Sequence, residues 1–209
     1  MRTRINSLIE EIGPKYARHG RSFLDVVPKY QPVERVMFAY KLLAELWEES
    51  FDSDSTDCAF AAKKLLELLD IPCDIVNGQL KNYPEGENHC WNIVEIDGQR
   101  FHFDTFFLNP DNMDLLLRNN DVDPFYVEDQ HYTFFCVSNQ VISQTHIIGN
   151  CEMPVDCEHS LSHELVSDLA AMEVLLYVRN RWMTKGMMPS TPVRIHYKPS
   201  TKPIPLSFE

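Results

Sequence analysis

The feature that most constrains the fold is an Asp-Gly pair, Asp97-Gly98, which separates two runs typical of β-strands. Residues 88–96 read NHCWNIVEI, and residues 99–107 read QRFHFDTFF. Both runs contain aromatic and β-branched residues, which favour strands, and a two-residue Asp-Gly connection favours the tight turn of a β-hairpin. We therefore expect two antiparallel strands in which Ile96 faces Gln99.

This register predicts which side chains share a face of the hairpin. It pairs Trp91 with Asp104, so that His89 and Asp104 are diagonal neighbours on one face, with backbones about 7–8 Å apart and side chains closer. A carboxylate in that position can accept a hydrogen bond from one imidazole nitrogen and leave the other nitrogen for a nucleophile. A single β-bulge would separate the two residues, because it would put them on opposite faces.

Cys58 is the candidate nucleophile. Apolar residues recur at spacings of three and four over residues 31–50 and again over residues 57–69, which predicts two amphipathic helices. Cys58 then lies in the first turn of the second helix, where the helix dipole lowers the pKa of a thiol. The candidate N-cap residues are Ser55, Thr56 and Asp57. The alternative is that Cys58 is a small residue of the core, like many free cysteines.

The remaining elements are predicted from shorter patterns. We expect strands over 73–80 and 131–138, a helix over 111–118, and a long helix over 161–183, whereas 139–146 fits either a helix or a strand. A short helix is also expected over 5–12, and the last 25 residues, with five prolines, are expected to be extended. The predicted organisation is a wrapping segment over 1–30, a core over 31–157, and a C-terminal helix and tail over 158–209.

Two stretches resemble the core of the transglutaminase-like superfamily, which has a papain-like fold. They are DCAFAAKKLLELLDIPCDIVNGQL (57–80) and NHCWNIVEIDGQRFHFDTFF (88–107), and YTFFCVSNQVISQTH (132–146) resembles a later family segment. In that family a cysteine opens a helix, a histidine lies two residues before a tryptophan, and an aspartate ends the next strand. The matching positions are Cys58, His89 with Trp91, and Asp104; Thr56 stands where the family commonly has glycine.

The resemblance implies an α+β fold and a Cys58–His89–Asp104 triad that needs no cofactor or metal. Such a site forms a thioester, and hydrolysis of peptide or amide bonds is the expected reaction. An amine acceptor in place of water would give transglutaminase-type acyl transfer, and a catalytically silent interaction module is the third reading. His102 shares a strand face with Asp104 and is the alternative base, although it is expected to pack within the sheet. Trp91 and Asp57 are the candidate substrate-binding residues.

The formal net charge of −12 bears on partners and location. Such a charge repels phosphate backbones and anionic lipids, so nucleic acids and membrane surfaces are not expected partners. The sequence contains no apolar run of the roughly 18 residues that a membrane span needs, and we expect a cytoplasmic protein with reduced thiols. Acidic residues crowd the segment before Cys58 and suggest peptides rich in Lys or Arg, or amines, as substrates; the alternative is a solvated acidic loop. They are Glu48, Glu49, Asp52, Asp54 and Asp57.

The other cysteines have structural interpretations. Three of them lie in predicted strands and are expected in the core: Cys73, Cys90 and Cys136. Cys151, Cys157, His159 and His163 lie close together in sequence, but their spacing matches no common zinc pattern. No metal site is therefore expected there, and a Cys151–Cys157 disulfide is the less favoured alternative.

Overall fold

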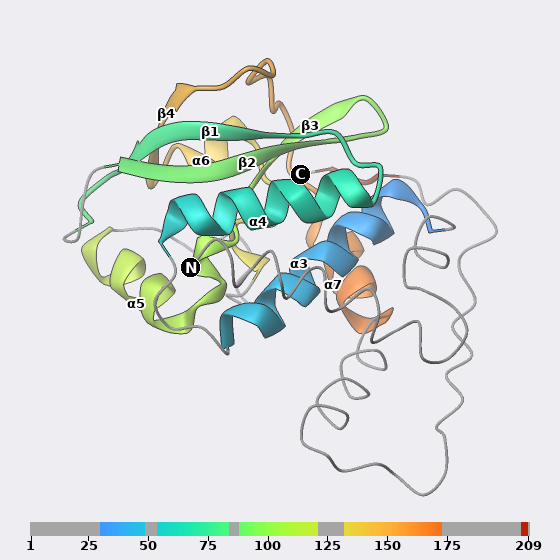
Figure 1. The fold of residues 1–209 in the computed structure, drawn as a ribbon, viewed down its shortest axis with the longest axis horizontal. Coiled ribbons are helices and arrows are strands. Elements are labelled where there is room, and N and C mark those ends of the chain that lie inside the picture. The colour runs from blue at the N-terminus through green and yellow to red at the C-terminus, as the bar shows by residue number, and fades with distance from the viewer. Residues whose placement is uncertain (1–29, 49–53, 84–87, 121–131, 173–205, 209) are drawn as a thin grey trace, which may run out of the picture.

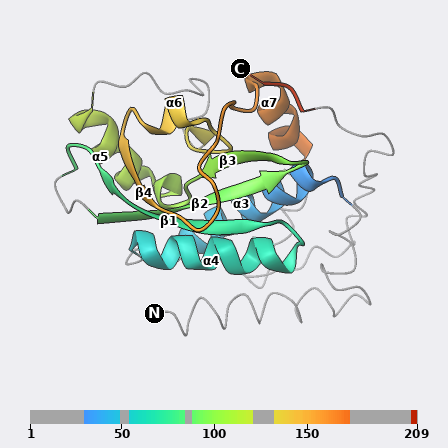
Figure 2. The same cartoon turned by 90° about the horizontal axis from the view of Figure 1, so that it is seen from above.

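The computed structural model describes residues 30–48, 54–83, 88–120, 132–172 and 206–208. Four strands form one antiparallel sheet with the order β3-β2-β1-β4. The strands are β1 (Cys73–Leu80), β2 (Asn88–Ile96), β3 (Gln99–Phe103) and β4 (His146–Asn150). Helices pack on both sides of this sheet, with α4 on one face and α6 on the other (Figures 1 and 2). The mixed α and β composition with an antiparallel sheet agrees with the α+β class expected from the sequence.

The hairpin forms in the predicted register. Ile96 pairs with Gln99, and the pairing continues without a bulge to Asn92 and Phe103. Asp97 and Gly98 both have positive φ, 50° and 80°, which are the left-handed conformations that a two-residue turn between twisted strands requires. β2 is therefore held so that His89, Trp91 and Ile93 point to one face, and all three are buried.

The two predicted helices are α3 (Pro32–Glu48) and α4 (Ser55–Leu68). The N-cap of α4 is Asp54, whose side chain accepts from the Asp57 backbone N–H, so none of the three expected cap residues takes this role. Cys58 lies in the first turn, as predicted. Cys58, Ala62 and Leu65 lie on the inward side of α4 and are buried, as is the C-cap residue Leu69.

The strand predicted over 99–107 is shorter in the structure. It ends at Phe103, because the Asp104 carboxylate accepts from the backbone N–H of Phe106 and turns the chain into the 3₁₀ helix η2 (Phe106–Leu108). Helix α5 (Pro110–Asn119) follows, with Asn109 as its N-cap. This turn places Asp104 just beyond the end of β3.

The prediction of a strand over 131–138 is wrong for the described part, 132–138. These residues form turns, and Val137 makes a single bridge to His102. Cys136 has φ 53°, a left-handed conformation that interrupts an extended run. The run is apolar because Phe134 and Phe135 are buried in the core as part of a loop.

The ambiguous segment after it contains a short helix, α6 (Asn139–Ile142), and then strand β4. β4 was not predicted, because its five residues include Gly149 and Asn150 and show no alternation of apolar and polar residues. It pairs with β1, and His146 faces Leu80 there.

The C-terminal helix begins at His163, slightly later than predicted, and continues to the end of this described segment. α7 (His163–Met172) contributes Leu165, Val166 and Leu169 to the same hydrophobic cluster as α3 and α4. The rest of the helix predicted to residue 183, the helix predicted over 5–12 and nearly all of the C-terminal 25 residues lie outside the described residues. None of the described helices is long and apolar enough to cross a membrane.

Candidate functional site

His89 and Asp104 form a buried pair. The distance from His89 Nε2 to Asp104 Oδ2 is 2.7 Å, and the two side chains are 2% and 1% exposed. The pair forms because the hairpin has no bulge and because the η2 turn directs the carboxylate back toward β2. His89 Nδ1 makes no hydrogen bond to the described residues, so the pair leaves this nitrogen available, as the predicted site requires.

A second imidazole, which the sequence did not point to, shares the same carboxylate. His146, the first residue of β4, lies with Nε2 3.1 Å from Asp104 Oδ2. Its Nδ1 is 2.7 Å from the hydroxyl of Thr145. The only sequence signal for this residue was its position at the end of the segment 132–146, where the family resemblance ends.

The surroundings keep Asp104 ionised. Burial on its own would raise the pKa of the Asp104 carboxyl, but its electrostatic interaction with His89 and the hydrogen bonds from His146 and His89 outweigh this effect and hold the pKa well below its usual value. Burial lowers the pKa of His146, against the hydrogen bond to Asp104, so that His146 is neutral at pH 7. The site therefore contains one buried carboxylate with two imidazole partners.

The Cys58 thiol lies within the electrostatic reach of this group. Burial raises the pKa of Cys58 well above its usual value, and the charges of Asp104, Asp54 and Asp57 raise it further. These effects outweigh the expected lowering by the helix N-terminus. The thiol makes no hydrogen bond to His89 or to another described side chain, so in the resting structure only the charge of Asp104 links the protonated thiol to the His–Asp pair.

His102, the alternative base, has a different role. Its Nδ1 accepts from Trp91 Nε1 at 2.9 Å, and its Nε2 lies 2.7 Å from Asn139 Oδ1. Both ring nitrogens are thus engaged within the fold, and burial lowers the pKa of His102 to about 4. His102 packs within the sheet, as expected.

The two candidate substrate-binding residues lie in different environments. Trp91 is completely buried and stacks on His89, with ring centroids 5.9 Å apart, so it forms a wall of the site. Asp57 is half-buried in the first turn of α4, one residue before Cys58. Of the acidic segment before Cys58, residues 49–53 lie outside the described residues.

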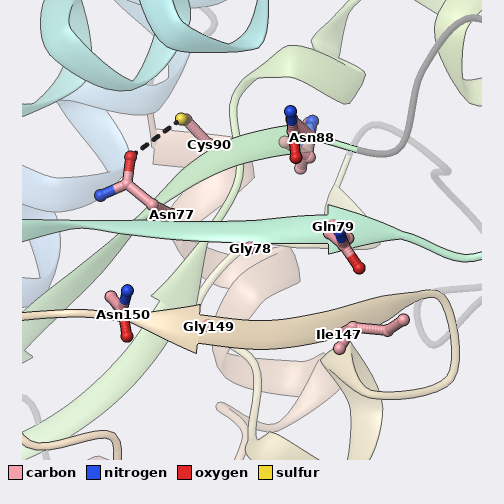
Figure 3. A pocket seen from close by; sticks show the side chains of 9 residues that line it. Asn77, Gly78, Gln79, Asn88, Cys90, Ile147, Gly149 and Asn150 are labelled. Atoms are coloured by element: carbon pink, nitrogen blue, oxygen red, sulfur yellow. Dashed lines mark hydrogen bonds between the residues drawn. The ribbon is translucent and has the colours of Figure 1, made fainter.

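A hollow of about 480 Å³ lies over strands β1, β2 and β4 beside the site (Figure 3). Carboxamide side chains dominate its described lining, which includes no Asp, Glu, Lys or Arg. The lining residues are Asn77, Gly78, Gln79, Asn88, His89, Cys90, Ile147, Gly149 and Asn150.

Cys90 connects this hollow to the N-terminal turn of α4. Its thiol donates to Asn77 Oδ1 at 3.4 Å and lies 3.7 Å from the Thr56 hydroxyl, and its backbone N–H donates to Ser55 Oγ. Cys90 is half-buried, so the prediction that it belongs to the core is wrong. The predictions for Cys73 and Cys136 are confirmed, since both are buried.

Among the described residues, one group of side chains brings possible metal-ligand atoms together. Ligand atoms of His89, Asp104 and His146 all lie within 4.8 Å of one another. Two ligands of a tetrahedral zinc ion, each about 2.0–2.1 Å from the metal, are about 3.3 Å apart. The 2.7 Å between His89 Nε2 and Asp104 Oδ2 is shorter than that and is typical of a hydrogen bond, so this geometry favours N–H···O bonds over shared metal coordination.

The residues of the considered zinc pattern do not converge in the described part of the chain. Cys151 donates to Asp74 Oδ2, Cys157 is buried in the core, and His159 stacks on Phe208. Cys151 and Cys157 are both free thiols, so the alternative disulfide is not formed.

Comparison with models of protein families finds no match to the chain, and comparison with curated proteins finds none at a significant level.

Proposed function

We propose that this protein is a cysteine-dependent acyl-transfer enzyme in which Cys58 is the nucleophile, His89 the base and Asp104 the residue that orients His89. The observation that carries the proposal is the buried 2.7 Å contact between His89 Nε2 and Asp104 Oδ2, which leaves Nδ1 without a hydrogen-bond partner among the described residues. An imidazole held in this way is oriented to exchange a proton with a nucleophile. The nucleophile is Cys58, which lies in the first turn of α4 and whose pKa is raised by the charge of Asp104.

The reaction follows from these positions. His89 Nδ1 takes the proton of the Cys58 thiol as the sulfur attacks the carbonyl carbon of an amide, and backbone N–H groups at the start of α4 stabilise the negative oxygen. The tetrahedral intermediate collapses when His89 returns the proton to the leaving amine, which leaves a thioester on Cys58. Water then attacks the thioester carbonyl and releases a carboxylic acid and the free thiol.

The proposed substrate is a peptide or another carboxamide. The hollow beside the site offers the side chains of Asn77, Gln79, Asn88 and Asn150, each of which can both donate and accept hydrogen bonds. That is the pattern that a peptide backbone needs. The described lining does not carry the negative charge that would select cationic substrates, so any preference for Lys, Arg or free amines would come from the acidic segment before Cys58.

One observation favours a second candidate, a binding module without catalysis. The Cys58 thiol is 4% exposed, its pKa is raised, and no hydrogen bond joins it to His89. If the protein is an enzyme, Cys58 and His89 would come together when substrate binds, since catalytic hydrogen bonds are often long or poorly aligned without substrate. If it is a binding module, Cys58 and His89 would stay apart.

Alkylation by iodoacetamide followed by peptide mass mapping separates the two candidates. Exposure alone predicts that the half-buried Cys90 reacts before the buried Cys58. The enzyme predicts the reverse order, with Cys58 reacting faster than a free cysteine at pH 7 and the fast phase lost in Cys58→Ala but kept in Cys90→Ala. Modification of Cys90 first, with Cys58 unreactive in the folded protein, would favour the binding module.

A second experiment distinguishes hydrolysis from amine transfer. A glutamine-containing peptide is incubated with the protein, with and without an added primary amine, and the products are identified by mass. Hydrolysis adds the mass of water to a cleaved peptide or converts glutamine to glutamate, whereas transfer gives the amine conjugate. Cys58→Ala is the control for both products.

A further inference from the structure

His146 makes contacts that the proposed reaction does not use. It is 1% exposed, and it is brought to Asp104, 42 positions earlier in the chain, by the pairing of β4 with β1. Its Nε2 and that of His89 lie 3.1 Å and 2.7 Å from the same oxygen, Asp104 Oδ2. The other carboxylate oxygen, Oδ1, accepts from the Phe106 backbone N–H. Three donors from three segments therefore fix one carboxylate.

The hydrogen positions of His146 follow from its neighbours. An ionised carboxylate only accepts hydrogen bonds, so Nε2 must carry a proton. In the neutral ring Nδ1 is then an acceptor, so the Thr145 hydroxyl, 2.7 Å away, donates to it rather than to the Ile142 carbonyl, which lies at 3.5 Å. The Asp104 carboxylate therefore sets the tautomer of His146, and the Thr145 hydroxyl stabilises that tautomer by donating to Nδ1.

We propose that His146 is a positioning residue for the reaction of Cys58: it holds the Asp104 carboxylate in the orientation that aligns His89, and Thr145 stabilises the donating tautomer of His146. This inference rests on the proposed function. Without the His146 donor, the carboxylate oxygen that orients His89 keeps only one side-chain partner and can rotate about its Cβ–Cγ bond. The His89 ring would then hold the orientation that the reaction needs for a smaller fraction of the time.

One carboxylate and several aromatic rings lie against His146. Asp104 hydrogen-bonds His89 and His146, and its charge also acts on Cys58 and on His102. Aromatic rings surround His146 with centroids 5.0–5.8 Å from its own ring, and they belong to Trp91, Phe107, Phe134 and, at 5.2 Å, His89. An aromatic substitute at position 146 can therefore keep the packing while removing the hydrogen bond.

Two substitutions separate positioning from packing. His146→Gln places an amide N–H near the position of Nε2 and keeps the donor, whereas His146→Phe keeps an aromatic ring and loses the donor. The rate of Cys58 alkylation is measured across pH 5–9, with melting temperatures as a control for folding. Positioning predicts that His146→Gln stays within about threefold of the wild type, while His146→Phe falls by about tenfold or more, as expected for the loss of one hydrogen bond to a charged group.

A role in packing alone predicts that Phe is tolerated at least as well as Gln, and that result would overturn the proposal.

A second pair of variants leaves the histidine in place and changes Thr145 instead. Thr145→Val removes the hydroxyl that stabilises the tautomer and should slow alkylation, whereas Thr145→Ser keeps the hydroxyl and should not; equal rates for Val and Ser would also count against the proposal.

The failure of this proposal differs from the failure of the proposed function. If Cys58 of the wild type reacts no faster than a free cysteine, the proposed function fails. If the wild type reacts rapidly and His146→Phe reacts equally fast, only the role of His146 fails. Nitrogen-15 NMR of the imidazole groups provides a further readout, since protonated Nε2 atoms that exchange slowly are expected for both His89 and His146 in the wild type.

Discussion

His102 should make the protein sensitive to mild acid, and the reason lies in its two hydrogen bonds. Trp91 Nε1 is a donor only, so the Nδ1 atom that faces it at 2.9 Å must be unprotonated. Asn139 donates through Nδ2 to the Val155 carbonyl, which leaves its Oδ1 to accept from His102 Nε2. Protonating Nδ1 would place two donors opposite each other in a site with no exposure to water.

The magnitude follows from the pKa of His102. In the folded protein this pKa is lowered from 6.5 to about 4, mainly by burial. Between pH 4 and pH 6.5 the unfolded chain therefore binds a proton that the folded chain does not, so the free energy of unfolding rises with pH in this window. A pKa shift of this size lowers the free energy of unfolding by about 3 kcal/mol between pH 7 and pH 4. That is a large part of the roughly 5–15 kcal/mol that stabilises a typical domain.

Urea denaturation at several pH values between 4 and 7.5 measures this dependence. His102→Asn is the informative variant, because Asn keeps an acceptor that can face Trp91 and has no proton to gain. This variant should be less stable at every pH, because it loses the contact to Asn139. Its free energy of unfolding should nevertheless depend less on pH, because position 102 no longer gains a proton. His146, Asp104 and Asp74, whose pKa values are also lowered, contribute to the slope that remains. Parallel curves for the wild type and His102→Asn over this range would refute the reasoning.

Three further substitutions have definite expected outcomes. Asp54→Ser keeps an N-cap for α4 and removes a charge that raises the pKa of Cys58, so unfolding should change by no more than about 0.5 kcal/mol while alkylation of Cys58 at pH 7 becomes faster. Gly78→Ala would bring a Cβ atom to 2.6 Å from Trp91 Cζ3 and even closer to the Ile147 carbonyl, so it should lower the melting temperature by several degrees and slow alkylation of Cys58; an unchanged melting temperature would contradict this packing. Asp74→Asn weakens the bonds from Lys63 and from the N–H groups of Glu152 and Met153, and urea denaturation should show a loss of about 1–3 kcal/mol.

The sequence predicted those parts of the fold that local patterns determine. The Asp97-Gly98 turn fixes the register of β2 and β3, because a two-residue turn leaves no freedom in the pairing. Once the register is known, His89 and Asp104 must approach each other. The helical spacing over 57–69 likewise predicts that Cys58 lies in the first turn of a helix, as it does.

The parts that were missed depend on contacts between distant segments. His146 reaches Asp104 only because β4 pairs with β1, and nothing local in the sequence indicates that pairing. The run 132–138 has the composition of a strand, but it is buried as a loop, since burial and strand formation both favour aromatic residues. The raised pKa of Cys58 is a consequence of tertiary burial, which outweighs the local effect of the helix terminus.

The most direct test of the proposed triad is the alkylation rate of Cys58 in Asp104→Asn relative to the wild type. Electrostatics alone predicts a faster reaction in this variant, because the Asp104 charge raises the pKa of the Cys58 thiol. The triad predicts the opposite: without the carboxylate His89 is no longer oriented, and the rate should fall by about tenfold or more, as expected for the loss of a hydrogen bond to a charged group. A rate equal to or above that of the wild type, in a folded variant, would contradict the assignment of Cys58, His89 and Asp104 as a catalytic unit.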